Sequence, residues 1–149
     1  MRLADEIALR PAADRGAVPH SELVIAGRPT GQTVPGKVLE AAIAVGERYL
    51  VFLTEGVTME ERLSIHLVSS GGRLLDSAGV GVMTALGLFA RLKLVPPRHV
   101  NFQFLGDLQW SVEVHARPRL TWPFWREAPG VKRPWGLRRA FRVRATRPV

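Results

Sequence analysis

The stretch LSIHLVSSGGRLLD, residues 63–76, indicates the fold class of this chain. Leu63, Ile65 and Leu67 alternate with Ser64 and His66, and a period of two is typical of a strand that buries one face. Gly71-Gly72 follows and separates this run from a second one, Arg73–Asp76. Because glycine tolerates the positive φ angles of tight turns, the stretch predicts a β-hairpin.

The same arrangement recurs on both sides of this hairpin. Gly46-Glu47 divides two short apolar runs upstream, and Gly106-Asp107 divides two more downstream. No proline lies between Gly36 and Val95, which suits a hydrogen-bonded scaffold because proline lacks a backbone donor. Successive hairpins predict a mainly antiparallel β-sandwich or open barrel of about seven to nine strands.

Two segments leave the choice between strand and helix open. Residues 38–45 are rich in alanine, and residues 82–92 place apolar side chains at helical spacing. Gly87 would cost about 1 kcal/mol in a helix interior. We favour strands in both segments, with one short helix as the alternative.

The chain length of 149 residues predicts a single domain, which we divide into three parts. Residues 1–21 are expected to form an irregular N-terminal arm, and residues 22–116 the β core. Residues 117–149 form a C-terminal segment rich in basic residues, tryptophan and proline. It contains three of the four tryptophans of the chain.

Composition excludes several classes of protein. The chain has no cysteine, which rules out a disulfide framework, a thiolate zinc site, an iron–sulfur cluster and a cysteine nucleophile. A hydrophobic content of 46% is too high for a disordered chain. Residues 1–10 contain four charged side chains, and the longest uncharged run, Ser77–Ala90, is shorter than the ~18 residues of a membrane span. We therefore expect a cytoplasmic protein with no membrane span.

The positive charge is concentrated at one end of the chain. The formal net charge is +8, but residues 117–149 contain ten basic side chains and one glutamate, which gives +9 and leaves −1 for the rest. Only Lys37, Lys93 and Lys132 among the 21 basic residues are lysines. A bacterial genome rich in G and C favours arginine codons throughout, but such a bias does not explain this segregation.

The C-terminal segment supplies the candidate partner-binding residues. Phe141, Val143 and Ala145 alternate with basic residues, so a strand here would turn Arg138, Arg142 and Arg144 outward as a row. Tryptophan and arginine are enriched in protein interface hot spots, whereas an arginine row beside aromatic residues also suits nucleic-acid binding. A third interpretation is a structural tail pinned over the sandwich. The candidates are Trp122, Trp125, Trp135, Arg138, Arg139, Arg142 and Arg144.

Two other patterns have some features of chemical sites. Gly31–Lys37 matches the G-x4-G-K frame of a phosphate-binding loop, but Val38 replaces the metal-binding hydroxyl and Pro35 removes an N–H donor, so we predict an ordinary turn-rich loop. His66, Glu113 and His115 could form a metal or acid–base site with Asp76 or Asp107 if the strand register allowed it. We predict instead that these residues lie on a solvated outer face.

These observations favour a non-enzymatic interaction or assembly module. Its partner would be another protein, or a second copy of the same chain, held by the C-terminal segment. One alternative is nonspecific binding of RNA or single-stranded DNA, and a less favoured one is an enzyme with a His/Glu site. The sequence indicates no cofactor and no metal.

Overall fold

The computed structural model describes residues 1–13, 16, 18–56, 62–81, 88–121 and 127–146. The described residues form antiparallel strands and contain no helix. The strands are β1 (Arg2–Leu3), β2 (Ile7–Pro11), β3 (His20–Ile25), β4 (Arg28–Pro35), β5 (Val38–Val45), β6 (Arg48–Thr54), β7 (Leu63–Ser69), β8 (Leu74–Val80), β9 (Ala90–Val95), β10 (His99–Gln103), β11 (Gln109–Leu120), β12 (Val131–Lys132) and β13 (Arg138–Thr146).

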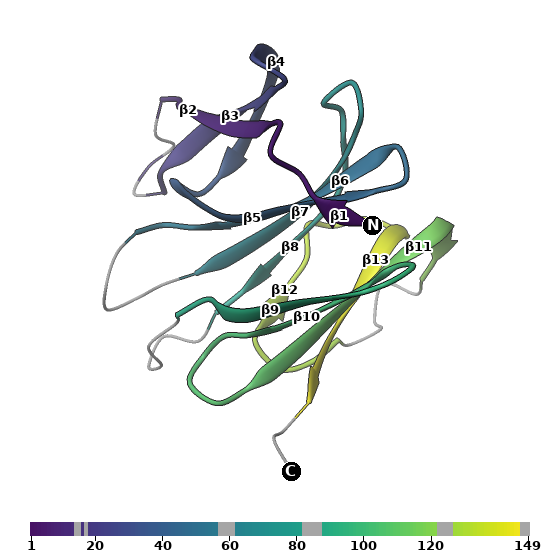
Figure 1. The fold of residues 1–149 in the computed structure, drawn as a ribbon. Coiled ribbons are helices and arrows are strands. Elements are labelled where there is room, and N and C mark those ends of the chain that lie inside the picture. The colour runs from purple at the N-terminus through teal and green to yellow at the C-terminus, as the bar shows by residue number, and fades with distance from the viewer. Residues whose placement is uncertain (14–15, 17, 57–61, 82–87, 122–126, 147–149) are drawn as a thin grey trace.

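The strands form three sheets stacked in layers (Figure 1). The central sheet has six strands in the order β1-β5-β6-β7-β8-β12. A four-stranded sheet, β13-β11-β10-β9, packs on one of its faces, and a three-stranded sheet, β2-β3-β4, covers part of the other. The predicted β-sandwich of successive hairpins is confirmed, and the sheets do not close into a barrel.

The central sheet is buried on both faces, which explains its composition. Ile43, Leu50 and Phe52 point into the core shared with the four-stranded sheet. Val51 and Leu53, the alternate residues of β6, point into the core beneath the three-stranded sheet. Strands covered on both sides lose the polar half of the alternating pattern and read as continuous apolar runs.

The predicted hairpins are confirmed. Gly46-Glu47 joins β5 to β6, Gly71-Gly72 lies between β7 and β8, and Gly106-Asp107 lies between β10 and β11. Residues 38–45 are a strand, so the helical alternative for them is wrong. In the second ambiguous segment, residues 90–92 begin β9, whereas residues 82–87 lie outside the described part of the chain.

Three expectations are corrected. The N-terminal arm is not irregular, since β1 pairs with β5, and β2 pairs with β3 along its whole length. The described residues form thirteen strands rather than seven to nine, because the arm and the C-terminal segment add to the central hairpins. Gly31–Pro35 lies within β4, so this part of the G-x4-G-K frame is a strand and not a turn-rich loop, whereas Gly36 and Lys37 form the short connection to β5.

Gly72 ties the β7–β8 turn to the three-stranded sheet. Its φ is +88°, and a Cβ there would lie 2.4 Å from Cγ2 of Thr30 on β4. We expect Gly72→Ala to lower the free energy of unfolding by about 2 kcal/mol, through backbone strain and this clash together. Gly46→Ala is the matched control, because Gly46 also has a positive φ (+61°) but no atom within 4 Å. Urea unfolding of both variants should show the smaller loss, about 1 kcal/mol, for Gly46→Ala; equal losses would contradict the packing role.

No helix that could cross a bilayer occurs in the part of the chain that the structure describes.

Candidate partner-binding site

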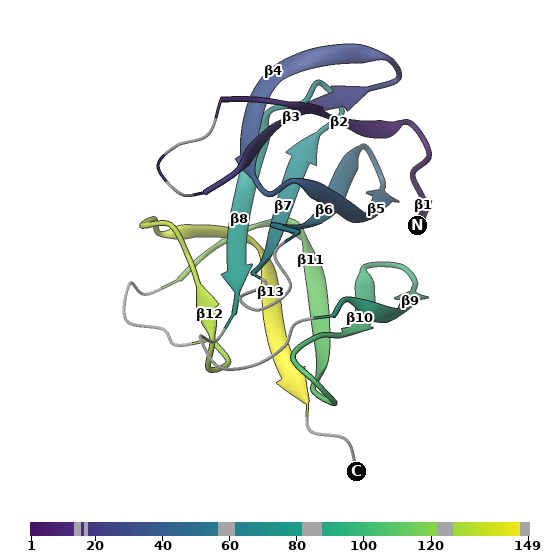
Figure 2. The same cartoon turned by 90° about the vertical axis from the view of Figure 1, so that its left-hand side faces the viewer.

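The C-terminal segment joins two sheets of the sandwich (Figure 2). β12 pairs with β8 at the edge of the central sheet, and β13 pairs with β11 at the edge of the four-stranded sheet. Phe141 and Val143 of β13 are fully buried in the core between these sheets. Residues 138–146 are therefore an integral strand of the fold.

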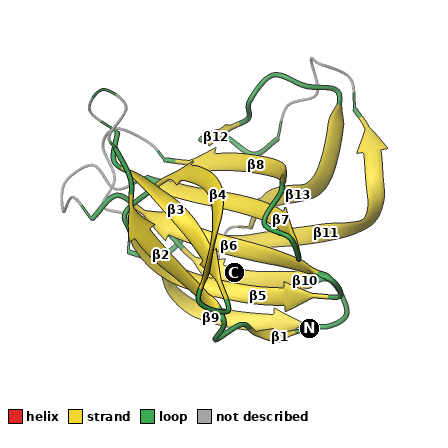
Figure 3. Ribbon diagram, turned by 90° about the horizontal axis from the view of Figure 1, so that it is seen from above, coloured by secondary structure: helices red, strands yellow, loops and turns green. Residues whose placement is uncertain are grey.

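A bulge bends β11 and β13 beside this junction (Figure 3). Val114 pairs with Phe141 and Arg119 pairs with Arg139, so four residues of β11 face one residue of β13. The four residues are His115–Pro118, three more than on β13, and a bulge is one of the few places where a sheet accepts proline. The bend places Arg119 and His115 beside the part of the C-terminal segment that runs between β12 and β13.

Arg133 is the centre of a buried ion-pair network. Its Nε donates to Oε1 of Glu127 at 2.6 Å, and its Nη2 donates to Oε2 of the same residue at 3.1 Å. Its Nη1 donates to Oδ2 of Asp76 on β8 at 3.0 Å. The guanidinium also lies over the Phe141 ring, with 4.3 Å from Cζ to the ring centroid. The planar, five-donor guanidinium suits such a site because it can serve several acceptors at once.

The same network satisfies the outer edge of β13. Asp76 accepts the Ala140 N–H at 2.8 Å, and Glu127 accepts the Val143 N–H at 3.0 Å. Arg133 donates to the Phe141 carbonyl at 2.6 Å. Side chains thus occupy part of the edge where a neighbouring strand would otherwise pair.

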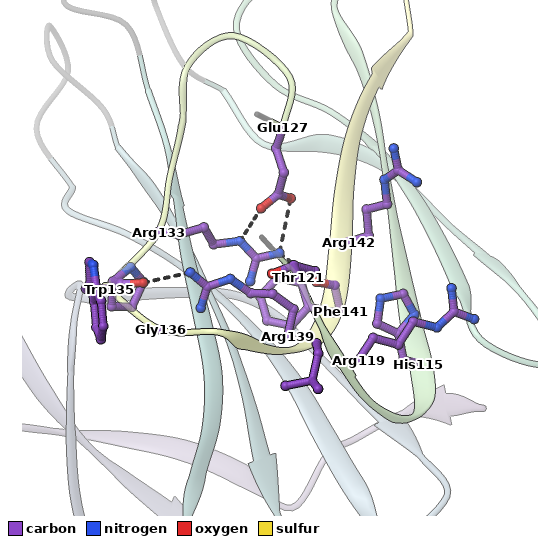
Figure 4. Close-up of a pocket in the computed structure, with 12 residues that line it drawn as sticks. His115, Arg119, Thr121, Glu127, Arg133, Trp135, Gly136, Arg139, Phe141 and Arg142 are labelled. Atoms are coloured by element: carbon purple, nitrogen blue, oxygen red, sulfur yellow. Dashed lines mark hydrogen bonds and ion pairs between the residues drawn. The ribbon is translucent and has the colours of Figure 1, made fainter. Parts of the chain in front are cut away.

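The network forms one wall of a cavity of about 400 Å³, which we call the arginine pocket (Figure 4). Four arginines and one glutamate line it, so the lining carries a large excess of positive charge. Arg133 is neutralised by Glu127 and Asp76, and Arg139 lies 3.6 Å from Asp76. Arg119 has no ion-pair partner among the described residues. The lining residues are His115, Arg119, Leu120, Thr121, Glu127, Arg133, Pro134, Trp135, Gly136, Arg139, Phe141 and Arg142.

Exposed apolar side chains adjoin the arginine pocket. Trp135 is 89% exposed and Leu120 is 78% exposed, and both also line a second cavity that includes Leu75 and Leu137. Because the two cavities share these residues, cationic and apolar surfaces are continuous. Such a combination resembles the composition of interface hot spots.

His115 is a buried histidine at the edge of this charged surface. It is only 5% exposed, and its Nδ1 has no hydrogen-bond partner, with Oε1 of Glu113 4.0 Å away. Burial lowers the pKa of His115, and the charge of Arg119 lowers it further, while Glu113 opposes the shift. Arg133 and Arg142 also lower this pKa. The imidazole therefore lies in a positive potential.

The structure gathers some of the predicted residues and separates others. Trp135, Arg139 and Arg142 line the arginine pocket, and Arg138 lines the second cavity with Arg139. Arg144 is exposed on β13 but lines neither cavity. Trp122 and Trp125 lie outside the described residues.

The predicted arginine row is broken. Ala140 and Phe141 are both buried, which interrupts the alternation of inward and outward residues along β13. Arg138 is thereby shifted out of phase with Arg142 and Arg144. The predicted row assumes a regular strand, and the bulge opposite it leaves no signal in the local sequence.

The predicted solvated histidine face is also corrected. His66 and His115 are 2% and 5% exposed, because His66 lies in the doubly covered central sheet and His115 lies in the bulge. The His66 Nδ1 lies 2.8 Å from the Ser77 hydroxyl on β8, whereas Glu113 contacts His115 and His99. No group of three or more metal-ligating side chains occurs among the residues that the structure describes.

The sequence did not identify Glu127, Arg133 and Arg119 as site residues, and it suggested Asp76 only as a possible ligand beside the histidines. Asp76 and Arg133 are 57 positions apart, so only the pairing of the C-terminal segment with β8 brings them together. A weak signal was available, since Glu127 is the one carboxylate within the basic segment.

Comparison of the chain with family models, curated proteins and solved structures finds no match.

Proposed function

We propose that this protein is a non-enzymatic docking module that binds an acidic segment of another protein. The observation that supports this proposal is the continuity of the arginine pocket with the exposed Trp135 and Leu120. A peptide with acidic and large apolar side chains would complement both parts of the surface. Trp and Arg dominate binding energies in interfaces of this kind.

Charge favours an acidic occupant over a neutral one. The pocket lining contributes four arginines against one glutamate, and the whole segment from residue 117 to residue 149 has a charge of +9. Complementary charge accelerates association and disfavours partners of the same sign. The broken arginine row and the concave shape of the site favour a peptide over an extended nucleic-acid strand.

The test is the affinity of a defined acidic probe for point variants. The probe is a labelled synthetic peptide in which glutamates flank a Leu-Ser-Phe centre, and its binding is followed by fluorescence anisotropy. We expect Trp135→Ala to weaken binding by roughly tenfold or more, because a central hot-spot side chain is lost. Its free energy of unfolding should change by less than about 0.5 kcal/mol, because the side chain is largely exposed.

Leu88→Ala is the matched control, since Leu88 is 76% exposed and lines neither cavity. Equal effects of Trp135→Ala and Leu88→Ala would contradict the proposed site. Tighter binding of a single-stranded oligonucleotide than of the acidic probe, with a steep dependence on salt, would favour nucleic-acid binding and overturn the proposal. Point variants are preferred to deletion of residues 117–149, because that deletion removes the core residues of β13.

A further inference from the structure

We infer that the arginine pocket contains a subsite for a phosphate monoester, formed around Arg119 and His115, and that the acidic partner carries a phosphorylated side chain there. This inference rests on the proposed docking function and specifies the chemistry of its anchoring group. It depends on the part of the pocket away from the Arg133 network, where the β11 bulge meets β13.

The distribution of charge locates this subsite. Arg133 has two carboxylate partners, and Arg139 shares Asp76 with it. Arg119 contacts no carboxylate among the described residues, yet it lines the same cavity. Its guanidinium is therefore available to an anion that enters the pocket. Arginine binds phosphate particularly well because its planar donors match two phosphate oxygens.

The position of His115 provides an independent observation. Its side chain lines the cavity although the residue is only 5% exposed, and its buried Nδ1, which has no hydrogen-bond partner, lies 4.0 Å from Oε1 of Glu113. Because Nδ1 is enclosed beside Glu113, an anion in the cavity would meet the remaining edge of the ring. Figure 4 shows His115 and Arg119 together on one side of the pocket, opposite Trp135.

Charge balance favours a dianion over a single carboxylate. Four charged groups act on the protonation of His115. Glu113 favours it, and three arginines disfavour it, namely Arg119, Arg133 and Arg142. A phosphate dianion would reverse this balance and allow the imidazole to take up a proton. Arg119 and a protonated His115 would then match its two negative charges. A carboxylate would bring only one charge and would favour protonation of the imidazole less.

The experiment compares three versions of the acidic probe, with serine, phosphoserine or glutamate at the central position. We expect the phosphoserine probe to bind roughly tenfold more tightly than either of the others. Arg119→Gln should abolish this preference, whereas Arg144→Gln, on an exposed arginine of β13, should leave it unchanged. Equal affinities for phosphoserine and glutamate, or equal losses in the two variants, would overturn the inference.

The proton linkage gives a second readout. Binding of the phosphoserine probe should raise the pKa of His115, which is measured by NMR on the full-length wild-type protein. The His115 signal is assigned by its absence from the spectrum of His115→Asn. An unchanged His115 pKa in the bound state would contradict the subsite. Trp135→Ala should weaken all three probes equally and preserve their ratios. The ratios therefore test the subsite, while the absolute affinities test the proposed docking function.

Discussion

Replacing Arg133 with methionine is expected to lower the free energy of unfolding by about 3–5 kcal/mol. The substitution leaves the carboxylates of Asp76 and Glu127 without their shared guanidinium, and their side chains are only 3% and 11% exposed. An uncompensated buried charge is far more costly than the loss of an exposed ion pair. The Phe141 carbonyl on the edge of β13 also loses its donor. Urea unfolding followed by tryptophan fluorescence measures the change.

Two further variants identify the cause of this loss. Arg144→Met changes an exposed arginine on the same strand and should alter stability by less than about 0.5 kcal/mol. Adding Asp76→Asn and Glu127→Gln to Arg133→Met should restore part of the lost stability, because neither buried carboxylate then carries an uncompensated charge. If the triple variant were less stable than Arg133→Met alone, hydrogen bonding rather than uncompensated charge would explain the effect.

The arginines of the C-terminal segment have two different roles. Arg133 holds the segment against β8 and β13, whereas Arg119 and Arg142 face the pocket. The net charge of +9 in this segment, in which Glu127 is already counted, therefore overstates the charge available to a partner, because Asp76 of β8 pairs with Arg133 and Arg139. Affinity for an acidic partner should depend on a few positions and not on the overall charge.

The sequence predicted the fold class because local signals determine it. Alternation in β7 and β11 and the glycine turns after β5, β7 and β10 depend on neighbouring residues alone. Residues 38–45 remained ambiguous because β5 is buried on both faces, so its apolar residues have no period of two. The layered arrangement of three sheets depends on contacts between distant residues, which periodicity does not reveal.

The candidate site was predictable only in part for the same reason. Trp135, Arg139 and Arg142 were identified from the composition of one segment, and they do line the pocket. Their neighbours Arg119 and His115 belong to β11, where a bulge changes the direction of the side chains. A one-residue change in phase reverses which face a strand residue occupies, so the prediction of an arginine row is wrong where the bulge begins.

Acidification is expected to destabilise the protein through His66. This histidine is 2% exposed, its Nε2 has no hydrogen-bond partner, and burial lowers its pKa to about 4. An unfolded histidine titrates near pH 6.5. Between these values the unfolded chain binds a proton that the folded protein does not, so stability falls as the pH falls. Over the whole interval the loss amounts to about 3 kcal/mol.

His66→Asn isolates this contribution. Asparagine keeps a polar group for the Ser77 hydroxyl, which lies 2.8 Å from Nδ1, but it does not titrate. We expect the variant to lose most of the pH dependence between about pH 6.5 and pH 4.5. The ion pair with Arg2 lowers the pKa of Glu6 to about 2, so its contribution is lost only at lower pH. Urea unfolding at several pH values measures these slopes. An unchanged slope in His66→Asn would assign the acid sensitivity to other groups, with His115 the next to test because burial lowers its pKa in the same direction.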